Sequence, residues 1–144
     1  MRKRGGKNEA LGRSRGGLTT KIHLLVDALG MPLHFVLSGG QVNDCTQAGV
    51  LLESVKAGAV LADKGYDSNA ILAKIATMKA KAVIPPTRTR TIQRDYDRQL
   101  YKQRNLIERA FNKLKHCRRV ATRYDRKACY FLAFLHLAAF HIWA

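Results

Sequence analysis

Acidic residues are scarce in this sequence. Ten Asp and Glu residues stand against 26 Lys and Arg residues in a chain of 144, which gives a formal net charge of +16 at pH 7. A cationic excess of this size on one small chain favours a polyanionic partner, and nucleic acid is the first candidate.

Cysteine and long apolar runs are also in short supply. The three cysteines, Cys45, Cys117 and Cys129, form no CxxC pair, so they fit packing roles in a reducing cytosol better than disulfides or a zinc site. No apolar run follows the basic N-terminus, so no signal peptide is expected. The apolar stretch 128–143 is shorter than the roughly 20 residues of a membrane helix. It therefore predicts a buried C-terminal helix rather than a membrane anchor.

Hydrophobic residues, in contrast, make up 47% of the chain, which is enough for one packed domain of this length. Residues 1–17 differ, because they combine Arg and Lys with five glycines and cannot bury a core. We expect a flexible basic arm over 1–17 and a folded domain over 18–144. The arm can lie along phosphates, and a disordered tail without a partner is the alternative.

The first folded stretch predicts an antiparallel hairpin. Two β-rich runs, 19–28 and 32–40, flank a turn-like segment around Asp27, where Asp favours local hydrogen bonds. His23 and His34 are expected to face each other across the pair, with metal binding disfavoured. Asp44, with Gln47 three residues later, resembles a capping box for a helix that continues through Val55.

The next stretch predicts a parallel βαβ unit. The run 59–63 has no alternation and indicates a strand buried on both faces, a helix follows at 68–78 with Ser68 as its cap, and a second strand ends at Pro85. Asp63 stands at the carboxyl end of its strand, where ligand sites of α/β sheets collect. A turn or capping role for Asp63 is the alternative.

The residues after the second strand are strongly basic. The loop 87–96 carries Arg88, Arg90 and Arg94, which are candidate phosphate contacts or members of a merely solvated loop. The segment 97–119 lacks Pro and Gly, begins with an acid and ends with cations, so it predicts one long helix.

On that helix, polar side chains lie beside an apolar stripe. At about 100° per residue, Tyr101, Glu108 and Lys115 fall within roughly 40° of one another, and Arg104 lies about 60° from Tyr101. The pattern predicts a half-buried Glu108 that points into a site. The plainer interpretation is an i,i+4 ion pair between Arg104 and Glu108 on the surface. The apolar stripe comprises Leu100, Ile107, Ala110, Phe111 and Leu114.

The spacing Y-x2-R-x3-E-x6-K, over fifteen positions, resembles the signature around the last acidic residue of the DDE transposases of bacterial insertion sequences, in the group numbered four and five. Further stretches resemble the same family: ALGRSRGGLTTKIHLLVDALGMPL, LSGGQVNDCTQA, VLADKGYDS and RRVATRYDRKACYFLAFLHLAAFHIW. The resemblance covers residues 10–144.

The resemblance implies an α/β fold, an RNase H-like mixed sheet flanked by helices. It implies three carboxylates that hold two divalent ions, Mg²⁺ with Mn²⁺ possible, for phosphodiester hydrolysis and strand transfer. Asp63 matches the second carboxylate and Glu108 the third, so both are the expected catalytic and metal residues. Tyr101, Arg104 and Lys115 match the supporting signature, in which the two cations neutralise phosphate or keep Glu108 ionised.

One part of the family pattern has no match. The first catalytic Asp lies on a first strand upstream of the hairpin, and this chain has the basic arm there. We therefore expect an N-terminally truncated domain with the first strand missing, either a relic or a second reading frame joined to an upstream one by frameshifting. Asp27 is the first suspect for an acid that replaces the missing one.

Three functions follow from these patterns. The first is a transposase catalytic domain that is active only when an upstream segment completes it, on DNA in the bacterial cytoplasm and nucleoid and as an oligomer on that DNA. The second is a non-catalytic DNA-binding fragment or regulator, and the third is a small basic RNA-binding protein. The expected DNA contacts are Arg2, Lys3, Arg4, Arg13, Arg15, Arg88, Arg90 and Arg94.

Overall fold

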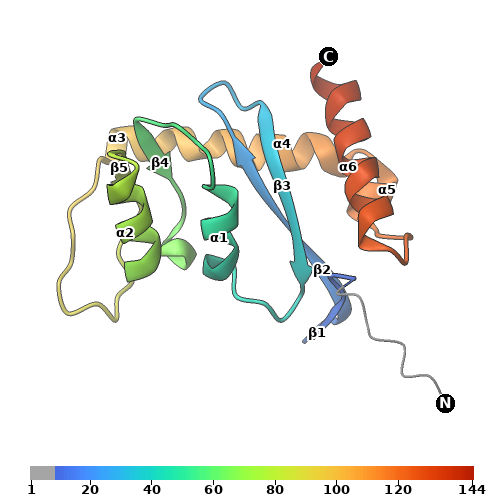
Figure 1. Ribbon diagram of the computed structural model, residues 1–144, viewed down its shortest axis with the longest axis horizontal. Coiled ribbons are helices and arrows are strands. Elements are labelled where there is room, and N and C mark those ends of the chain that lie inside the picture. Colours follow the sequence, from blue (N-terminus) through green and yellow to red (C-terminus); the bar gives the residue numbers. More distant parts are fainter. Residues whose placement is uncertain (1–8) are drawn as a thin grey trace.

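The structure, a computed structural model, describes residues 9–144 and contains two small sheets covered by helices (Figure 1). One sheet is antiparallel, in the order β1-β2-β3, and the other pairs β4 with β5 in parallel. The strands are β1 (Gly12–Ser14), β2 (Gly17–Val26), β3 (Pro32–Gly39), β4 (Ala59–Leu61) and β5 (Lys81–Val83). The α-helices are α1 (Cys45–Leu51), α2 (Asn69–Thr77), α3 (Arg98–Tyr101), α4 (Asn105–Lys115), α5 (Arg118–Ala121) and α6 (Ala128–Trp143), and the 3-10 helices are η1 (Lys64–Tyr66) and η2 (Lys102–Arg104). The predicted α/β class is therefore confirmed, with the strands divided between two sheets.

The β2–β3 hairpin is confirmed, and its turn is fixed by Asp27. The Asp27 carboxylate accepts hydrogen bonds from the backbone N–H groups of Leu29 and Met31, at 2.8 and 2.9 Å. The prediction that His23 and His34 face each other is wrong, because His23 lies opposite Val36 and His34 opposite Leu25. His23 instead lies buried with its Nε2 2.7 Å from the hydroxyl of Ser38.

Structure begins before the boundary that composition suggested at residue 17. β1 pairs with the start of β2, from Gly12 opposite Thr19 to Ser14 opposite Gly17. The Glu9 carboxylate accepts a hydrogen bond from the backbone N–H of Ala128 at 2.7 Å, which ties this segment to the start of α6. Arg2, Lys3 and Arg4 lie outside the described residues.

The predicted capping box of α1 is wrong. Asp44 precedes the helix in a helical conformation and makes no side-chain cap. Its carboxylate instead accepts a hydrogen bond from Lys21 Nζ at 2.9 Å, and the Cys45 N–H donates to the Asn43 side chain at 3.2 Å. The helix ends at Leu51 instead of continuing through residue 55, and Ser54 adopts a positive φ of 62°.

The parallel βαβ unit is confirmed. Ser68 caps α2 by accepting a hydrogen bond from the N–H of Ile71 at 3.2 Å. β4 is half-buried rather than buried on both faces. The reason is its edge opposite β5, which pairs with no other strand among residues 9–144.

The segment 97–119 is helical in pieces rather than one α-helix. Asp97 caps its start by accepting the N–H of Leu100 at 2.9 Å. The tight turn η2 then separates α3 from α4, and α4 ends at Lys115, four residues earlier than predicted. Two residues of the predicted apolar stripe, Ala110 and Leu114, are buried in the core.

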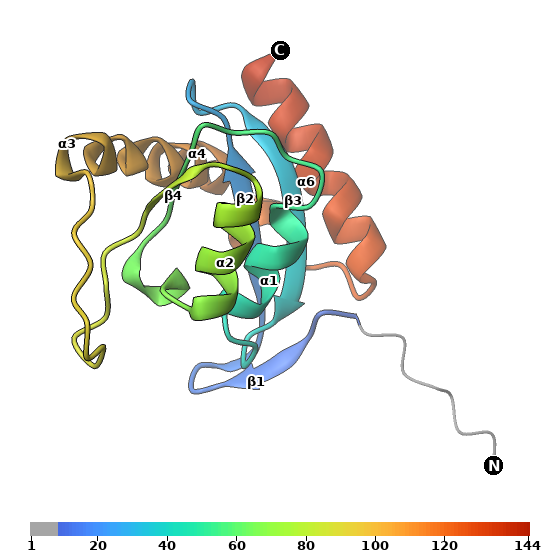
Figure 2. The ribbon, with the colours of Figure 1, turned by 60° about the vertical axis from the view of Figure 1, so that its left-hand side comes forward.

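Two hydrophobic cores lie on opposite faces of the hairpin. Leu24 and Phe35 pack with α4 and α6, whereas Leu25, the next residue along β2, packs against the core of α1, α2, β4 and β5. Figure 2 shows α1 and α2 on one side of the hairpin and α6 on the other. The predicted C-terminal helix is confirmed as α6, and among residues 9–144 no helix is long and apolar enough to cross a membrane.

Candidate functional site

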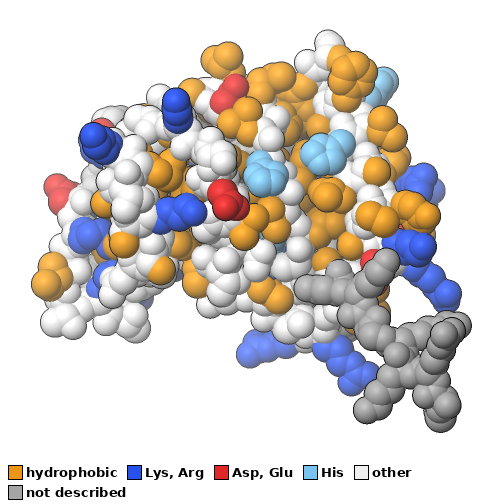
Figure 3. Space-filling view, in the orientation of Figure 1, with side chains coloured by type: hydrophobic (Ala, Val, Ile, Leu, Met, Phe, Trp, Pro, Cys, Tyr) orange, Lys and Arg blue, Asp and Glu red, His pale blue; other side chains and the backbone are white. Residues whose placement is uncertain are grey.

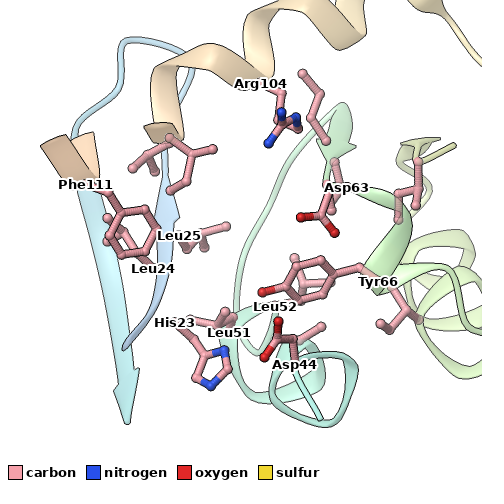
Figure 4. A pocket seen from close by; sticks show the side chains of 18 of the residues that line it. His23, Leu24, Leu25, Asp44, Leu51, Leu52, Asp63, Tyr66, Arg104 and Phe111 are labelled. Atoms are coloured by element: carbon pink, nitrogen blue, oxygen red, sulfur yellow. The ribbon is translucent and has the colours of Figure 1, made fainter. Parts of the chain in front are cut away.

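A cavity of about 470 Å³ lies between the two sheets (Figure 4). Consecutive residues of β2, 21–26, line one side of it, and consecutive residues at and after β4, 60–63, line another. The helices, together with Leu52 just after α1, contribute Ala48, Leu51, Ile71, Arg104, Ile107, Glu108 and Phe111 to its walls. Most of these side chains are apolar, and the polar groups are few.

The cavity meets both sheets at their edges. Successive side chains of a strand point to opposite faces, so a cavity that touches six consecutive residues of β2 reaches the strand from its side. Residues 21–26 pair with β3 alone, and β4 pairs with β5 alone among residues 9–144. Two strand edges with free backbone groups therefore border one space.

Asp63 enters this cavity from the carboxyl end of β4. Its carboxylate also accepts the N–H of Gly65 at 2.8 Å and caps η1, so the capping alternative and the site position both hold. Figure 4 shows Tyr66 between Asp63 and Asp44. Burial, with added repulsion from the charges of Asp44 and Asp63, raises the pKa of Tyr66 to about 12, so its hydroxyl stays protonated at neutral pH.

Glu108 lines the same cavity from α4 and is paired with Arg104. Arg104 Nη2 lies 2.6 Å from Glu108 Oε1, the i,i+4 ion pair of the plainer interpretation. The Glu108 side chain is 57% exposed, so the expected half-burial is wrong. Partial burial works against the charge of Arg104, but Tyr101, Glu108 and Asp63 outweigh it and raise the Arg104 pKa.

The two remaining signature residues occupy different positions. The guanidinium of Arg104 lies 5.5 Å from the ring centroid of Tyr101, a cation–π arrangement, and the ring of Tyr96 meets Tyr101 edge-on at 5.5 Å. The Tyr101 ring thus packs against the guanidinium of Arg104 and helps to position it. Lys115 is exposed at the end of α4, does not line the cavity, and forms no ion pair with any described residue.

The sequence did not reveal Asp67, which is the most strongly bound carboxylate near the site. Its side chain has 0% exposure and pairs with Arg90 Nε at 2.7 Å and Arg94 Nη1 at 2.9 Å, and it accepts the N–H of Thr87 at 2.7 Å. Burial alone would raise the Asp67 pKa, but these hydrogen bonds outweigh it and lower the pKa to about 2. The only available signal was three arginines in one loop near an acid-rich turn.

Asp67 is expected to make stability depend on pH at the acid end. Its folded-state pKa of about 2 lies below the ordinary 3.8, so the ionised group stabilises the fold above about pH 4 and this contribution is lost as the pH falls toward 2. Asp67→Asn is expected to lower the free energy of unfolding by about 2 kcal/mol at neutral pH. Urea unfolding between pH 7 and pH 2.5 checks this. If the difference in free energy of unfolding between wild type and Asp67→Asn stays constant down to pH 2.5, the prediction is contradicted.

The other predicted DNA contacts are exposed and basic. Arg13 in β1, Arg15 in the following turn and Arg88 in the loop are exposed. Figure 3 shows Lys and Arg at the margins of one face, with hydrophobic and His side chains in its centre. Arg90 and Arg94 differ from them, since the structure gives both an internal partner.

The donor set fits a hard divalent ion only in part. Asp63 and Glu108 offer carboxylate oxygens, which Mg²⁺ prefers, and Mg²⁺ sites often use one or two carboxylates with water and phosphate. No group of three or more His, Cys, Asp and Glu side chains that could hold a metal occurs within residues 9–144. Asp27 does not line the cavity, whereas Asp44 does.

Comparison with known proteins gives one consistent family. A family model described as Transposase DDE domain matches residues 2–142. A Brucella ovis protein, named as the proposed transposase for insertion sequence element IS6501, is 44% identical over 128 residues, which cover 88% of this chain and 98% of that protein. A Burkholderia cepacia protein, named as the proposed transposase for insertion sequence element IS402, is 33% identical over 137 residues, which cover 87% of this chain and 62% of that protein. No solved structure matches the chain.

Proposed function

We propose, from the premise that this chain belongs to the transposase DDE domain family, that it supplies two of the carboxylates with which a transposase cleaves and joins DNA at insertion-sequence ends. The two carboxylates are Asp63 and Glu108. The observation that carries this proposal is that the two acids line one cavity, although they stand 45 positions apart in the sequence. Both also raise the pKa of Arg104, which lines the same cavity.

The chemistry explains why carboxylates are needed here. Attack on a phosphodiester builds negative charge on the attacking and leaving oxygens, and a bound pair of divalent ions stabilises that charge. Asp63 and Glu108 would hold such ions through oxygen ligands. Arg104, held against Tyr101, forms an ion pair with Glu108 and would add a positive charge beside the phosphate.

The third carboxylate is proposed to arrive on a strand that fills the cavity between β2 and β4. The free edges of these strands offer backbone hydrogen bonds on both sides, and the walls from α1 and α4 are mostly apolar. Residues 1–8 are a poor occupant in chemical terms, because four of them are Lys or Arg and two are Gly. An upstream segment, joined to this chain or paired with it, suits the space better.

Metal binding is expected to depend on Glu108. Mn²⁺ or Mg²⁺ should raise the melting temperature of the wild-type chain, and Glu108→Gln should remove most of that rise because one of the two ligands is lost. Without metal, the variant is expected to lose a few tenths of a kcal/mol of stability, because its ion pair with Arg104 is lost. Glu53→Gln, an exposed acid outside the cavity, is the control. Equal metal stabilisation of all three proteins contradicts the assignment.

DNA binding is expected to be salt-sensitive and largely independent of sequence. Arg13→Ala with Arg15→Ala should flatten the dependence of log K on log salt by about two units, one for each lost phosphate contact. The matched control replaces Lys56 and Lys79, which are exposed near the opposite, amino ends of β4 and β5. Fluorescence anisotropy with a DNA duplex at several salt concentrations measures both slopes. If the two double variants change the slope equally, β1 is not a specific DNA contact.

A further inference from the structure

Asp67 organises the loop that follows β5. The loop follows the carboxyl end of β5. Because β4 and β5 are parallel, this is the same end of the sheet at which Asp63 follows β4. Asp67 accepts three hydrogen bonds from the loop, from the N–H of Thr87 and from the side chains of Arg90 and Arg94. A buried carboxylate that is fully paired in this way fixes the groups around it, since each lost partner leaves a charge unsatisfied.

Arg90 and Arg94 each donate two hydrogen bonds to groups of the protein. Arg90 donates to Asp67 through Nε and to Asn69 through Nη1, at 2.7 and 2.9 Å. Arg94 donates to Asp67 through Nη1 and to the carbonyl of Ile84 through Nη2, at 2.9 and 3.0 Å. Both forks therefore point toward the protein rather than toward solvent.

Arg88 is the arginine of the loop that remains available. It is exposed, and it forms no hydrogen bond or ion pair with any residue among 9–144. The backbone on both sides of it is held, because the Thr87 N–H is bound to Asp67 and the Gln93 side chain donates to the carbonyls of Thr87 and Arg90, both at 2.9 Å. A cation on a fixed loop loses less freedom on binding a phosphate than one on a mobile loop.

We infer that Asp67 is a positioning residue for DNA: it holds the loop through Arg90 and Arg94 so that Arg88 meets the phosphate backbone. Arg90 and Arg94, predicted from the sequence as DNA contacts, serve the loop instead. The inference rests on the proposed function, in which DNA lies along the edge that carries Asp63.

The sign of one charge change tests this. Asp67→Asn raises the net charge by one, so simple electrostatics predicts tighter DNA binding. The inference predicts weaker binding and a salt slope flattened by about one unit, the same change as in Arg88→Ala. Asp95→Asn, an exposed acid in the same loop, is the matched control and should bind at least as well as wild type. The double variant with Asp67→Asn and Arg88→Ala should bind no worse than Asp67→Asn alone, because both act on one contact.

Trypsin gives an independent measurement on the wild-type chain, which decides the matter if Asp67→Asn does not fold. Cleavage of the loop is expected after Arg88 and not after Arg90 or Arg94, and DNA should block the cleavage after Arg88. Tighter DNA binding by Asp67→Asn, or equal cleavage at all three arginines, overturns the inference. Absence of salt-dependent DNA binding by the wild-type chain would instead overturn the proposed function.

Discussion

Replacement of Asp63 by Asn, or of Glu108 by Gln, is expected to reduce cleavage of insertion-sequence ends by at least about 10³-fold in a completed transposase. Each substitution keeps the size of the side chain and removes the negative charge that would hold a divalent ion. Because Asp63 also caps η1, Asn retains an oxygen that can accept the Gly65 N–H. The loss should therefore appear in the chemical step while the fold stays intact.

The measurement compares nicking of end-containing DNA by wild-type and variant chains, each joined to a transposase segment that supplies the third carboxylate, with Mg²⁺ or Mn²⁺. Asp95→Asn and Glu53→Gln serve as controls, since both acids are exposed and outside the cavity. The 144-residue chain alone is expected to be inactive. Strong nicking by that chain would mean that an acid within it completes the set, and Asp44 then becomes the suspect, because it lines the cavity and Asp27 does not.

The local elements were predictable wherever short-range chemistry decides them. Apolar runs and turn residues indicated the β2–β3 hairpin and the β4–α2–β5 unit, and Ser68 caps α2 as its position suggested. The cap of α1 was missed for a long-range reason. The Asp44 carboxylate can either cap the helix or form an ion pair. It forms the ion pair, because Lys21, more than 20 residues earlier in the sequence, lies within hydrogen-bond distance. A sequence pattern around residues 44–47 cannot reveal this distant ion-pair partner.

The local geometry of the candidate site was predictable, whereas the surroundings of its side chains were not. Spacing in the predicted helix 97–119 placed Arg104 and Glu108 one helical turn apart, and the structure pairs them. The exposure of Glu108 depends on what lies across the cavity, which a helical projection cannot show. The roles of Arg90 and Arg94 depended on Asp67, which sits in a different element and reads as an ordinary turn acid in the sequence.

The cavity between the sheets leads to the second large expected effect, a gain of stability when a strand is added. Two strand edges that face one space have no strand partner among residues 9–144, and such edges favour association with other chains. A cavity of about 470 Å³ also leaves apolar walls without contacts. At about 24 cal/mol per Å³, filling it sets an upper limit of about 11 kcal/mol, and its opening to solvent makes the real gain smaller.

We therefore expect that a strand of about six apolar residues with one Asp, tethered to the N-terminus, raises the free energy of unfolding by several kcal/mol and the melting temperature by at least about 10 °C. Six residues match the free edge of β2 over 21–26, a length of roughly 20 Å. Circular dichroism with temperature gives the melting point, and sedimentation shows whether self-association decreases.

The matched control is the same tethered strand with Pro at its centre. Proline keeps the apolar character but removes one backbone donor and clashes with a central position in a sheet. A strand that enters the slot must hydrogen-bond to β2 and β4 along its length, so the Pro version should lose most of the gain. If both versions stabilise the chain equally, the added residues cover apolar surface without joining the sheets. The two sheets would then be complete as they stand, and the third carboxylate would have to reach Asp63 and Glu108 by another route.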